Sequence, residues 1–287
     1  MNRFASGPKQ HYYGKGDVIV YRLNRAGKTP AGTSPVFGAS VLMLLYGDAF
    51  WQTYTTGDNS KLIATDSMKN FIQRETMNFG GHDLEGFCRF LAEKFLLTYP
   101  QVEGLQVSAD EIPFGSIGST PAFVPAGPER AFARIELGHK GLIEATSGLK
   151  GFKLLRLGGS AFKGFVRDQY TTLPDLHNRP LHMWLDLDWT YTTAEAAFNV
   201  GAVTNRVRQI VRDVFAALES GSIQQIIYQM ATTLLADITS IAEVRLEATN
   251  RTWDTIAEKG DHLGVYTDAR PPYGCLGLTL SRDRGKG

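Results

Sequence analysis

One order of elements, strands followed by two helices and then more strands, occurs twice in this chain of 287 residues. The β-rich runs of the first half are 18–23, 36–46, 49–54, 105–112 and 131–137. Helices gathered in pairs, instead of alternating one by one with strands, favour an α+β fold with antiparallel sheets. We therefore predict two tandem units, at 12–143 and 144–287, each with an antiparallel sheet and two helices. Residues 1–11 are expected to form an extension that can be disordered.

Apolar spacing predicts the helices of the first half. Met68, Phe71 and Ile72 follow the i, i+3, i+4 rule of a helix face, and Asp66 or Ser67 is a suitable N-cap for that helix. The apolar face of the next helix is Leu84, Phe87, Cys88, Leu91 and Phe95.

The clearest strand of the second half covers 180–191. Its apolar residues are Leu181, Met183, Leu185, Leu187, Trp189 and Tyr191, and its alternating polar-side residues are His182, Trp184, Asp186, Asp188 and Thr190. Alternation puts the two sets on opposite faces, so one face should pack on a core. Two helices follow, the second capped by Ser222, and strands at 245–249 and 276–280 close the unit. Both sheets would have unpaired edges, and a barrel closed with other copies would protect them, which predicts an oligomer.

Composition excludes several classes of protein. Lys+Arg 30 against Asp+Glu 29 gives a net charge of +1, without the basic excess that nucleic-acid binding needs. No apolar run reaches the roughly 20 residues of a membrane span, and neither end carries a signal peptide or a Ser-Lys-Leu address. We expect a soluble, cytoplasmic protein. Cys88 and Cys275 have no metal-site spacing and should be reduced, mostly buried thiols.

Two motif readings from other classes are weak. Ala26-Gly27-Lys28-Thr29 resembles the end of a phosphate-binding loop, but the glycine required five residues before Gly27 is Arg22. His182, Asp186 and Asp188 share one face of a strand and could hold a metal. Solvated surface residues are the more usual explanation of that pattern, because a metal site needs ligands from other elements.

Five separated motifs carry a resemblance to a known family. They are Tyr13-Gly14-Lys15-Gly16-Asp17-Val18; Gly57-Asp58-Asn59-Ser60 with Ala64-Thr65-Asp66-Ser67-Met68-Lys69-Asn70; Gly164 to Leu173 with Phe162 before and Asn178-Arg179-Pro180 after; Ile223-Gln224; and Asn250. In this order, from about Tyr13 to Leu280, the chain resembles the urate oxidase (uricase) family.

That resemblance implies a fold, an assembly and a set of site residues. The fold is the tunnelling fold (T-fold), with two tandem ββααββ units per chain, and four chains form a homotetrameric barrel. Active sites lie between subunits. One chain supplies Lys15, Thr65 and Asp66, and another supplies Phe162, Arg179, Ile223, Gln224 and Asn250.

The chemistry of these side chains suits urate, a flat purine anion with hydrogen-bonding edges. Arg179 offers a planar fork of donors, Gln224 a donor and an acceptor together, and Phe162 a ring for stacking. Thr65 and Asp66 stand at a helix start, where backbone N–H groups can hold the far side of the purine.

The resemblance also implies the reaction. Urate itself supplies the electrons, so no metal or other cofactor is needed, and the products are 5-hydroxyisourate and hydrogen peroxide, within purine degradation. Lys15, made less basic by burial, takes a proton through Thr65, and Asn250 holds dioxygen and later water above the ring.

One position departs from the family. Fungal and animal members carry a histidine two residues after the asparagine, where this chain has Thr252. A threonine can relay a proton or hold water but does not titrate near neutral pH, so the third member of the relay is in doubt. His262 is a candidate substitute, although its neighbours are typical of an ordinary loop.

Plainer interpretations stay open for each residue. Lys15 could be a surface charge, Thr65 and Asp66 only a helix cap, and Arg179 the ion-pair partner of Asp168 or Asp175. Rival functions are an enzyme of the same fold acting on a pterin or guanine nucleotide, and a purine-binding or scaffold protein without catalysis.

Overall fold

The computed structural model describes residues 11–25, 34–118, 121–199, 203–260 and 262–282. The chain forms two compact units, the first ending at Ser147 with a short return at 193–201, and the second taking in Gly148–Thr192 and the chain from Ala202. The boundary predicted between residues 143 and 144 falls inside one continuous strand, β7 (Gly141–Arg156). The extension predicted at 1–11 lies outside the described residues, except for its last residue.

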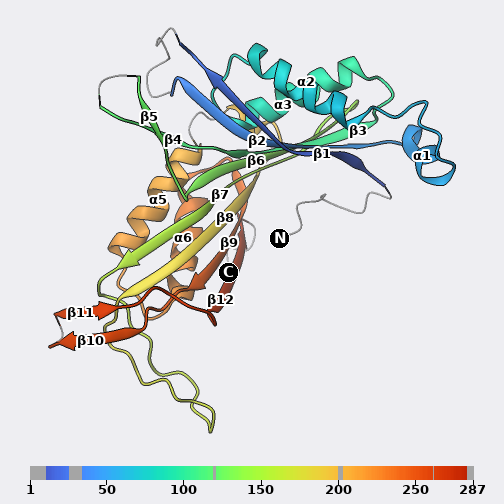
Figure 1. The fold of residues 1–287 in the computed structure, drawn as a ribbon. Helices are drawn as coiled ribbons and strands as arrows, with labels where there is room; N and C mark the ends of the chain where they lie inside the picture. The colour runs from blue at the N-terminus through green and yellow to red at the C-terminus, as the bar shows by residue number, and fades with distance from the viewer. Residues whose placement is uncertain (1–10, 26–33, 119–120, 200–202, 261, 283–287) are drawn as a thin grey trace. The chain divides into compact units, whose positions relative to one another are not determined.

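The first unit is an antiparallel sheet with two long helices on one face (Figure 1). Its strands follow the order β1 (Tyr13–Leu23), β2 (Val36–Tyr46), β3 (Gly104–Glu111), β6 (Arg130–Gly138) and the first part of β7. The helices are α2 (Thr65–Glu75), which packs on β1, and α3 (Leu84–Thr98), which packs on β3 and β6. The predicted apolar face of α3 is confirmed, since all five of its residues are buried.

The strand predicted at 49–54 is wrong. The chain there forms a short 3-10 turn, Asp48–Phe50, and a helix, α1 (Trp51–Thr55). Helical spacing brings the rings of Trp51 and Tyr54, three residues apart, to 6.3 Å from each other, and both lie against His11. Aromatic residues occur in both strands and helices, so the composition of residues 49–54 could not distinguish a strand from a helix.

Strand β7 is long but could not be predicted from the sequence. Gly148 and Gly151 interrupt its pattern, and the second has φ 79, outside the usual β region. Within the first unit, Ser147 of β7 donates a 2.5 Å hydrogen bond to the buried carboxylate of Glu85. The other elements not foreseen are β4 (Phe114–Ser116), β5 (Phe123–Pro125), α4 (Ala196–Asn199), β10 (Thr255–Lys259) and β11 (Leu263–Tyr266).

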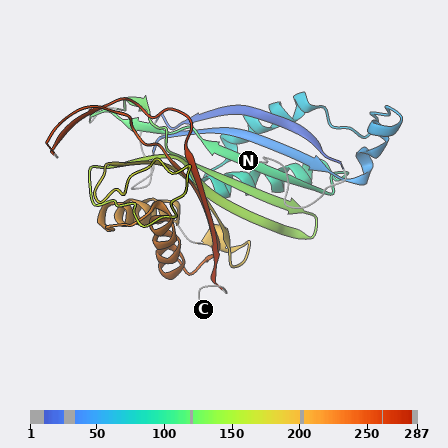
Figure 2. The same ribbon diagram turned by 90° about the horizontal axis from the view of Figure 1, so that it is seen from below.

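The second unit repeats the arrangement with the strand order β7, β8 (Leu181–Tyr191), β9 (Ile241–Asn250) and β12 (Gly274–Ser281). Its helices are α5 (Val203–Ala217) and α6 (Ile223–Asp237), of which α6 packs on β9 and β12. The alternation predicted for β8 is confirmed: the odd-numbered residues are buried and the even-numbered ones are partly exposed. Figure 2 shows the same elements from below, with the β10–β11 hairpin extending from the sheet.

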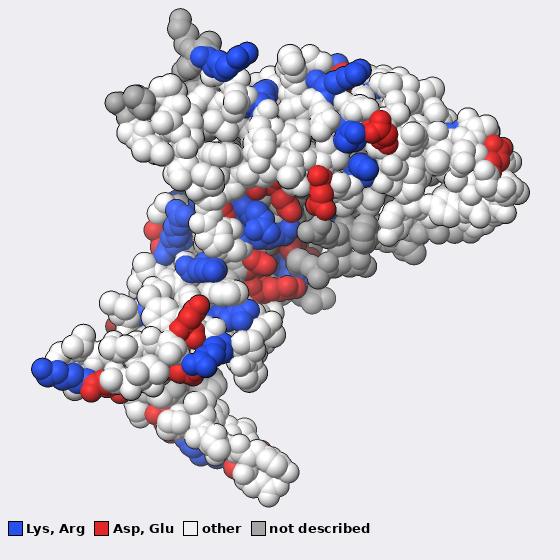
Figure 3. Space-filling view, in the orientation of Figure 1, with Lys and Arg blue, Asp and Glu red and all other residues white. Residues whose placement is uncertain are grey.

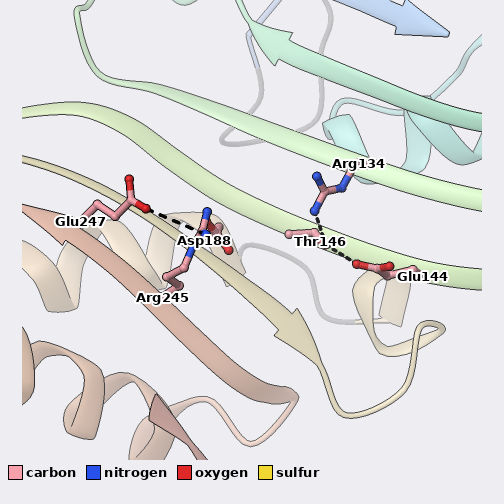
Figure 4. A network of polar contacts seen from close by, with 6 residues as sticks. All are labelled: Arg134, Glu144, Thr146, Asp188, Arg245 and Glu247. Atoms are coloured by element: carbon pink, nitrogen blue, oxygen red, sulfur yellow. Dashed lines mark hydrogen bonds and ion pairs between the residues drawn. The ribbon is translucent and has the colours of Figure 1, made fainter. Parts of the chain in front are cut away.

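Both units carry polar contacts between neighbouring strands of the sheet (Figure 4). In the first unit Arg134 contacts the Thr146 hydroxyl, which donates to Glu144. In the second, Arg245 lies 3.1 Å from Asp188 and 3.9 Å from Glu247. Charges of both signs are interspersed on the molecular face in Figure 3, in keeping with the near-zero net charge.

The structure also tests the expectations about membrane helices, the cysteines and the candidate metal ligands. No helix in the described part of the chain has the length and apolarity to cross a membrane. Both cysteines are free; Cys88 is buried, but Cys275 on β12 is exposed, so the expectation that both are mostly buried is wrong for Cys275. The carboxylate of Asp186 accepts a 2.7 Å bond from Gly151 N–H, and that of Asp188 is held by Arg245, so both have structural partners. Among the described residues no three His, Cys, Asp or Glu side chains are grouped as metal ligands.

Candidate active site

Lys15 lies at a β-bulge in β1. Its backbone pairs with Met43 of β2, and the register then shifts before the next pair, Val18 with Val41. A Cβ on Gly14 would come within 1.9 Å of the Met43 carbonyl oxygen, so only glycine fits there. A bulge redirects the side chains next to it. The Tyr-Gly-Lys-Gly-Asp motif is therefore the sequence that forms this bulge in β1.

Helix α2 begins next to β1 without a side-chain cap. Its N-cap is Ala64, which cannot accept a hydrogen bond, so the expectation that Asp66 or Ser67 caps the helix is wrong. Thr65 is the first helical residue and is half-buried, whereas Asp66 is exposed. The interpretation of Thr65 and Asp66 as a mere cap therefore fails, and backbone N–H groups of the first turn stay available.

Electrostatics links Asp66 to Lys15. The Asp66 carboxylate accepts bonds from Lys69 at 2.6 Å and Asn70 at 2.9 Å. Lys69 is the main reason that the pKa of Asp66 lies below its ordinary value, and the charge of Lys15 lowers the pKa further. The entry to the helix is also tied to β1, because the Tyr13 hydroxyl accepts a 3.0 Å bond from Ile63 N–H.

In the second unit, a long loop between β7 and β8 brings Phe162 and Arg179 together. Phe162 and Leu176 exchange two backbone bonds, of 2.7 and 2.9 Å, which close the loop on itself. Arg179 N–H donates to the Ser160 carbonyl at 3.0 Å, and Ser160 forms a parallel bridge with Ser220. Since Ser220 stands just before α6, the loop is fixed against the start of that helix.

The Arg179 guanidinium lies 5.7 Å from the centre of the Phe162 ring, which stacks on Phe165. It forms no ion pair with a described residue: Asp175 pairs with Arg167 at 3.2 Å, and Asp168 accepts local bonds from its own turn. Partial burial lowers the pKa of Arg179, and its Nε is buried without a partner in the described chain. The ion-pair alternative for Arg179 is therefore excluded within the described residues.

Helix α6 has the cap that α2 lacks. The Ser222 hydroxyl accepts a 3.2 Å bond from Gln225 N–H, as predicted, and Gln225 in turn accepts a 2.8 Å bond from Gly221 N–H. Ile223 is 4% exposed and points into the core, so only its backbone N–H can face a ligand. Gln224 is exposed at the positive end of the helix.

Asn250 ends β9, between Met183 of β8 and Gly274 of β12. It is half-buried, and its side chain has no hydrogen bond to another described residue. Thr252 lies exposed just outside the sheet. His262 is also exposed, next to the start of β11, in the kind of loop that its neighbours predicted.

Comparison with known proteins identifies the family. A family model described as Uricase matches residues 11–136 and 145–276. The chain belongs to the uricase family. It is 35% identical to the uricase of Haloferax volcanii, over 95% of this chain and 98% of that protein. It is 34% identical to the "Uric acid degradation bifunctional protein" of Bacillus sp. strain TB-90, but spans only 60% of that protein's length.

Solved structures agree with this assignment to the uricase family. The crystal structure of Bacillus sp. TB-90 urate oxidase matches with a TM-score of 0.86 and 34% identity, over 95% of this chain and all of that one. The chain therefore shares its fold with solved urate oxidases.

Two groups near the uricase motifs were not foreseen from the sequence. Ser160 and Ser220 are buried, and their hydroxyls have no partner in the described chain. Arg251, directly after Asn250, lies between two aromatic rings. Serines in a loop and an arginine at a strand end have no periodicity or motif that would single them out, so only their three-dimensional contacts could reveal them.

Proposed function

We propose that this chain is a urate oxidase that converts urate, dioxygen and water into 5-hydroxyisourate and hydrogen peroxide without a cofactor. The observation that carries the proposal is Arg179, a half-buried guanidinium over the Phe162 ring without an ion pair to a described residue. Its loop is hydrogen-bonded, through Ser160, to the segment before α6. A desolvated arginine with free donors next to a helix N-terminus suits a planar anion.

The urate clamp would consist of residues of the second unit. Arg179 would donate two parallel bonds to a carbonyl oxygen and the adjacent ring nitrogen, and Gln224 would bind the opposite amide edge. Phe162 would stack on the purine face, and Ile223 would contribute its backbone N–H because its side chain is buried.

The proton-handling residues would come from the first unit. Thr65 and the backbone N–H groups at the uncapped start of α2 would hold the far edge of urate, with Asp66 beside them. Lys15 would receive a proton through the Thr65 hydroxyl. The influence of Lys15 on the pKa of Asp66 supports its placement at this helix start.

Removal of that proton would make urate a strong enough reductant to pass an electron to dioxygen. Asn250 would hold dioxygen above the purine ring. Recombination forms a C–O bond to the ring, and its cleavage releases peroxide while water supplies the hydroxyl of 5-hydroxyisourate. Thr252 would relay the proton of that water. Oxygen gains the two electrons that urate loses, so the step balances without another reductant.

We further propose that each chain consists of two tandem T-fold units and that four copies assemble into a barrel with shared sites. The edge strands β1 and β12 each pair on one side only in the described chain, which supports pairing with another copy. Exposed apolar residues on β1 and on the β10–β11 hairpin support further contact: they are Ile19, Tyr21, Leu23, Ile256, Leu263 and Val265. The setting we propose is purine degradation in the cytoplasm.

The direct test is incubation of the chelator-treated protein with urate in aerated buffer. We expect loss of the ultraviolet absorption band of urate, with equimolar consumption of dioxygen and release of peroxide. A folded preparation that binds urate without oxidising it would favour the purine-binding alternative. Turnover of a pterin or guanine nucleotide in place of urate would favour the other enzyme class.

A further inference from the structure

Arg251 occupies the point where β9 leaves the sheet. Asn250 is the last residue of β9 that pairs on both sides, with Met183 and with Gly274. Arg251 adds one more backbone bond, because its N–H donates to the His182 carbonyl at 2.9 Å. Arg251 is therefore the last anchored residue before Thr252.

The Arg251 side chain joins both neighbouring strands. Its guanidinium carbon lies 4.0 Å from the centre of the Trp184 ring on β8 and 3.6 Å from the Tyr273 ring, just before β12. Its Nε donates a 3.2 Å bond to the Thr249 hydroxyl. A planar guanidinium can stack on aromatic rings and still donate in its own plane, which an ammonium group cannot do.

The cluster continues on both sides of the arginine. The Lys153 ammonium lies 4.5 Å from the Trp184 ring, so that ring is in contact with two cations. Trp253 packs edge-on against His182 at 5.0 Å. Both neighbours of Thr252 in the sequence, Arg251 and Trp253, are thus anchored to the first residues of β8.

The consequence concerns the orientation of Asn250. Its side chain continues the buried register of Leu246 and Ala248, on the face opposite to Arg251. Because successive side chains of a strand are carried on opposite faces of one backbone, a rotation of the backbone at Arg251 would also turn the Asn250 amide and displace Thr252. A misplacement of a reacting group by about 1 Å can slow an enzyme roughly 100-fold.

We propose that Arg251, clamped between Trp184 and Tyr273, is a positioning residue that orients Asn250 and Thr252 toward dioxygen. This inference rests on the proposed function, since it assigns Asn250 the dioxygen subsite. Arg251 acts through its neighbours and does not touch urate, so its effect should appear in the use of dioxygen and leave urate binding unchanged.

The test compares Arg251→Met with wild type in the full-length protein. We expect the KM for dioxygen to rise or kcat to fall roughly 10-fold, with the affinity for xanthine, a purine without the 8-oxo group, unchanged. Arg251→Lys should recover only part of the loss, because it keeps the charge but not the planar stacking. Arg245→Met is the matched control, because this arginine lies on β9 six residues before Arg251, on the same face, and pairs with Asp188.

Several outcomes would overturn the inference. Unchanged dioxygen kinetics in Arg251→Met, full rescue by lysine, or an equal effect in Arg245→Met would each do so. If Arg251→Met does not fold, Tyr273→Leu, at a side chain that is 44% exposed, tests the same clamp and should give the same selective loss. Inactivity of the wild-type protein toward urate would instead refute the proposed function.

Discussion

The two helix starts of the candidate site differ in how completely the single chain prepares them. At α6, Ser222 and Gln225 cap the helix, and the loop carrying Phe162 and Arg179 is hydrogen-bonded to the segment before it. At α2, Ala64 offers no cap, and Asp66 is exposed. The residues proposed to bind urate are thus held in place by contacts within the second unit, whereas those proposed to handle protons lie at an uncapped helix start of the first unit.

This difference indicates what each region needs from a ligand. Arg179 is already partly buried and lies over the Phe162 ring, so under the proposed function binding urate would cost little additional ordering. The uncapped N–H groups of α2 would be satisfied by the ligand itself. A helix start left without a cap is slightly destabilising, which proteins tolerate where function requires it.

The largest effect is expected from Arg179→Gln. Two charge-assisted hydrogen bonds at about 1.5–3 kcal/mol each predict a loss of roughly 10²- to 10⁴-fold in kcat/KM, most of it in KM. Steady-state kinetics and xanthine titration would measure it. Arg167→Gln is the matched control, because that arginine lies on the same loop and over Phe165 but pairs with Asp175. Equal losses in the two variants would show that the loop, not Arg179, carries the binding.

Lys15→Met tests the other region. Loss of a general base should lower kcat at least about 10²-fold while xanthine affinity changes little. Lys94→Met, which removes a surface lysine paired with Glu75 in the same unit, should have no effect on kcat. If Lys15→Met weakens xanthine binding as much as it lowers kcat, Lys15 is a clamp residue and the division of roles is wrong.

Two substitutions exchange the caps of the helices: Ala64→Ser adds a cap to α2, and Ser222→Ala removes the cap of α6. Ala64→Ser should cap α2 and raise the free energy of unfolding by about 0.5–1 kcal/mol, while kcat/KM falls roughly tenfold because the serine occupies N–H groups meant for the ligand. Ser222→Ala should lower the free energy of unfolding by about 1 kcal/mol. Chemical denaturation and kinetics on both variants provide the test. A more stable Ala64→Ser enzyme with unchanged activity would remove the role assigned to the open helix start.

The smallest effect is expected from Tyr13→Phe. Burial raises the pKa of Tyr13 to about 12 from an ordinary 10.0, so the stability that it contributes is complete below pH 10 and is lost as the pH rises toward 12. The variant should lose about 1 kcal/mol at neutral pH, because Ile63 N–H loses its acceptor. Its unfolding free energy should also fall less steeply between pH 10 and 12 than that of wild type. Tyr170→Phe, at an 80% exposed residue, is the control. If the unfolding free energy of Tyr13→Phe fell between pH 10 and 12 as steeply as that of wild type, the raised pKa assigned to Tyr13 would be contradicted.

Much of the fold could be predicted from periodicity, because burial imposes it. The alternation of β8 and the apolar face of α3 agree with the structure residue by residue. Strand β7 and the helix at Trp51 could not be predicted in this way. In β7 glycines break the pattern, and at Trp51 aromatic side chains fit either kind of element, so tertiary packing decides both.

The candidate site was predicted from family motifs and not from the residues alone. The structure adds why the motif residues take their positions: Gly14 cannot carry a side chain, and the main chain of Arg179 is bonded to Ser160. The absence of a cap on α2 and the clamp around Arg251 depend on contacts between distant segments. No local signal in the sequence reports such contacts.

Co-expression of Lys15→Met and Arg179→Gln chains tests the central claim, that one active site combines the first unit of one copy with the second unit of another. With random mixing, about one site in four would contain both native residues. Such a site takes its first unit from an Arg179→Gln chain and its second unit from a Lys15→Met chain. We therefore expect activity to return to about a quarter of the wild-type level in the mixed preparation, although each variant alone is nearly inactive. Mixed assemblies that stay as inactive as the two parent variants would show that Lys15 and Arg179 act within one chain, and would contradict the account.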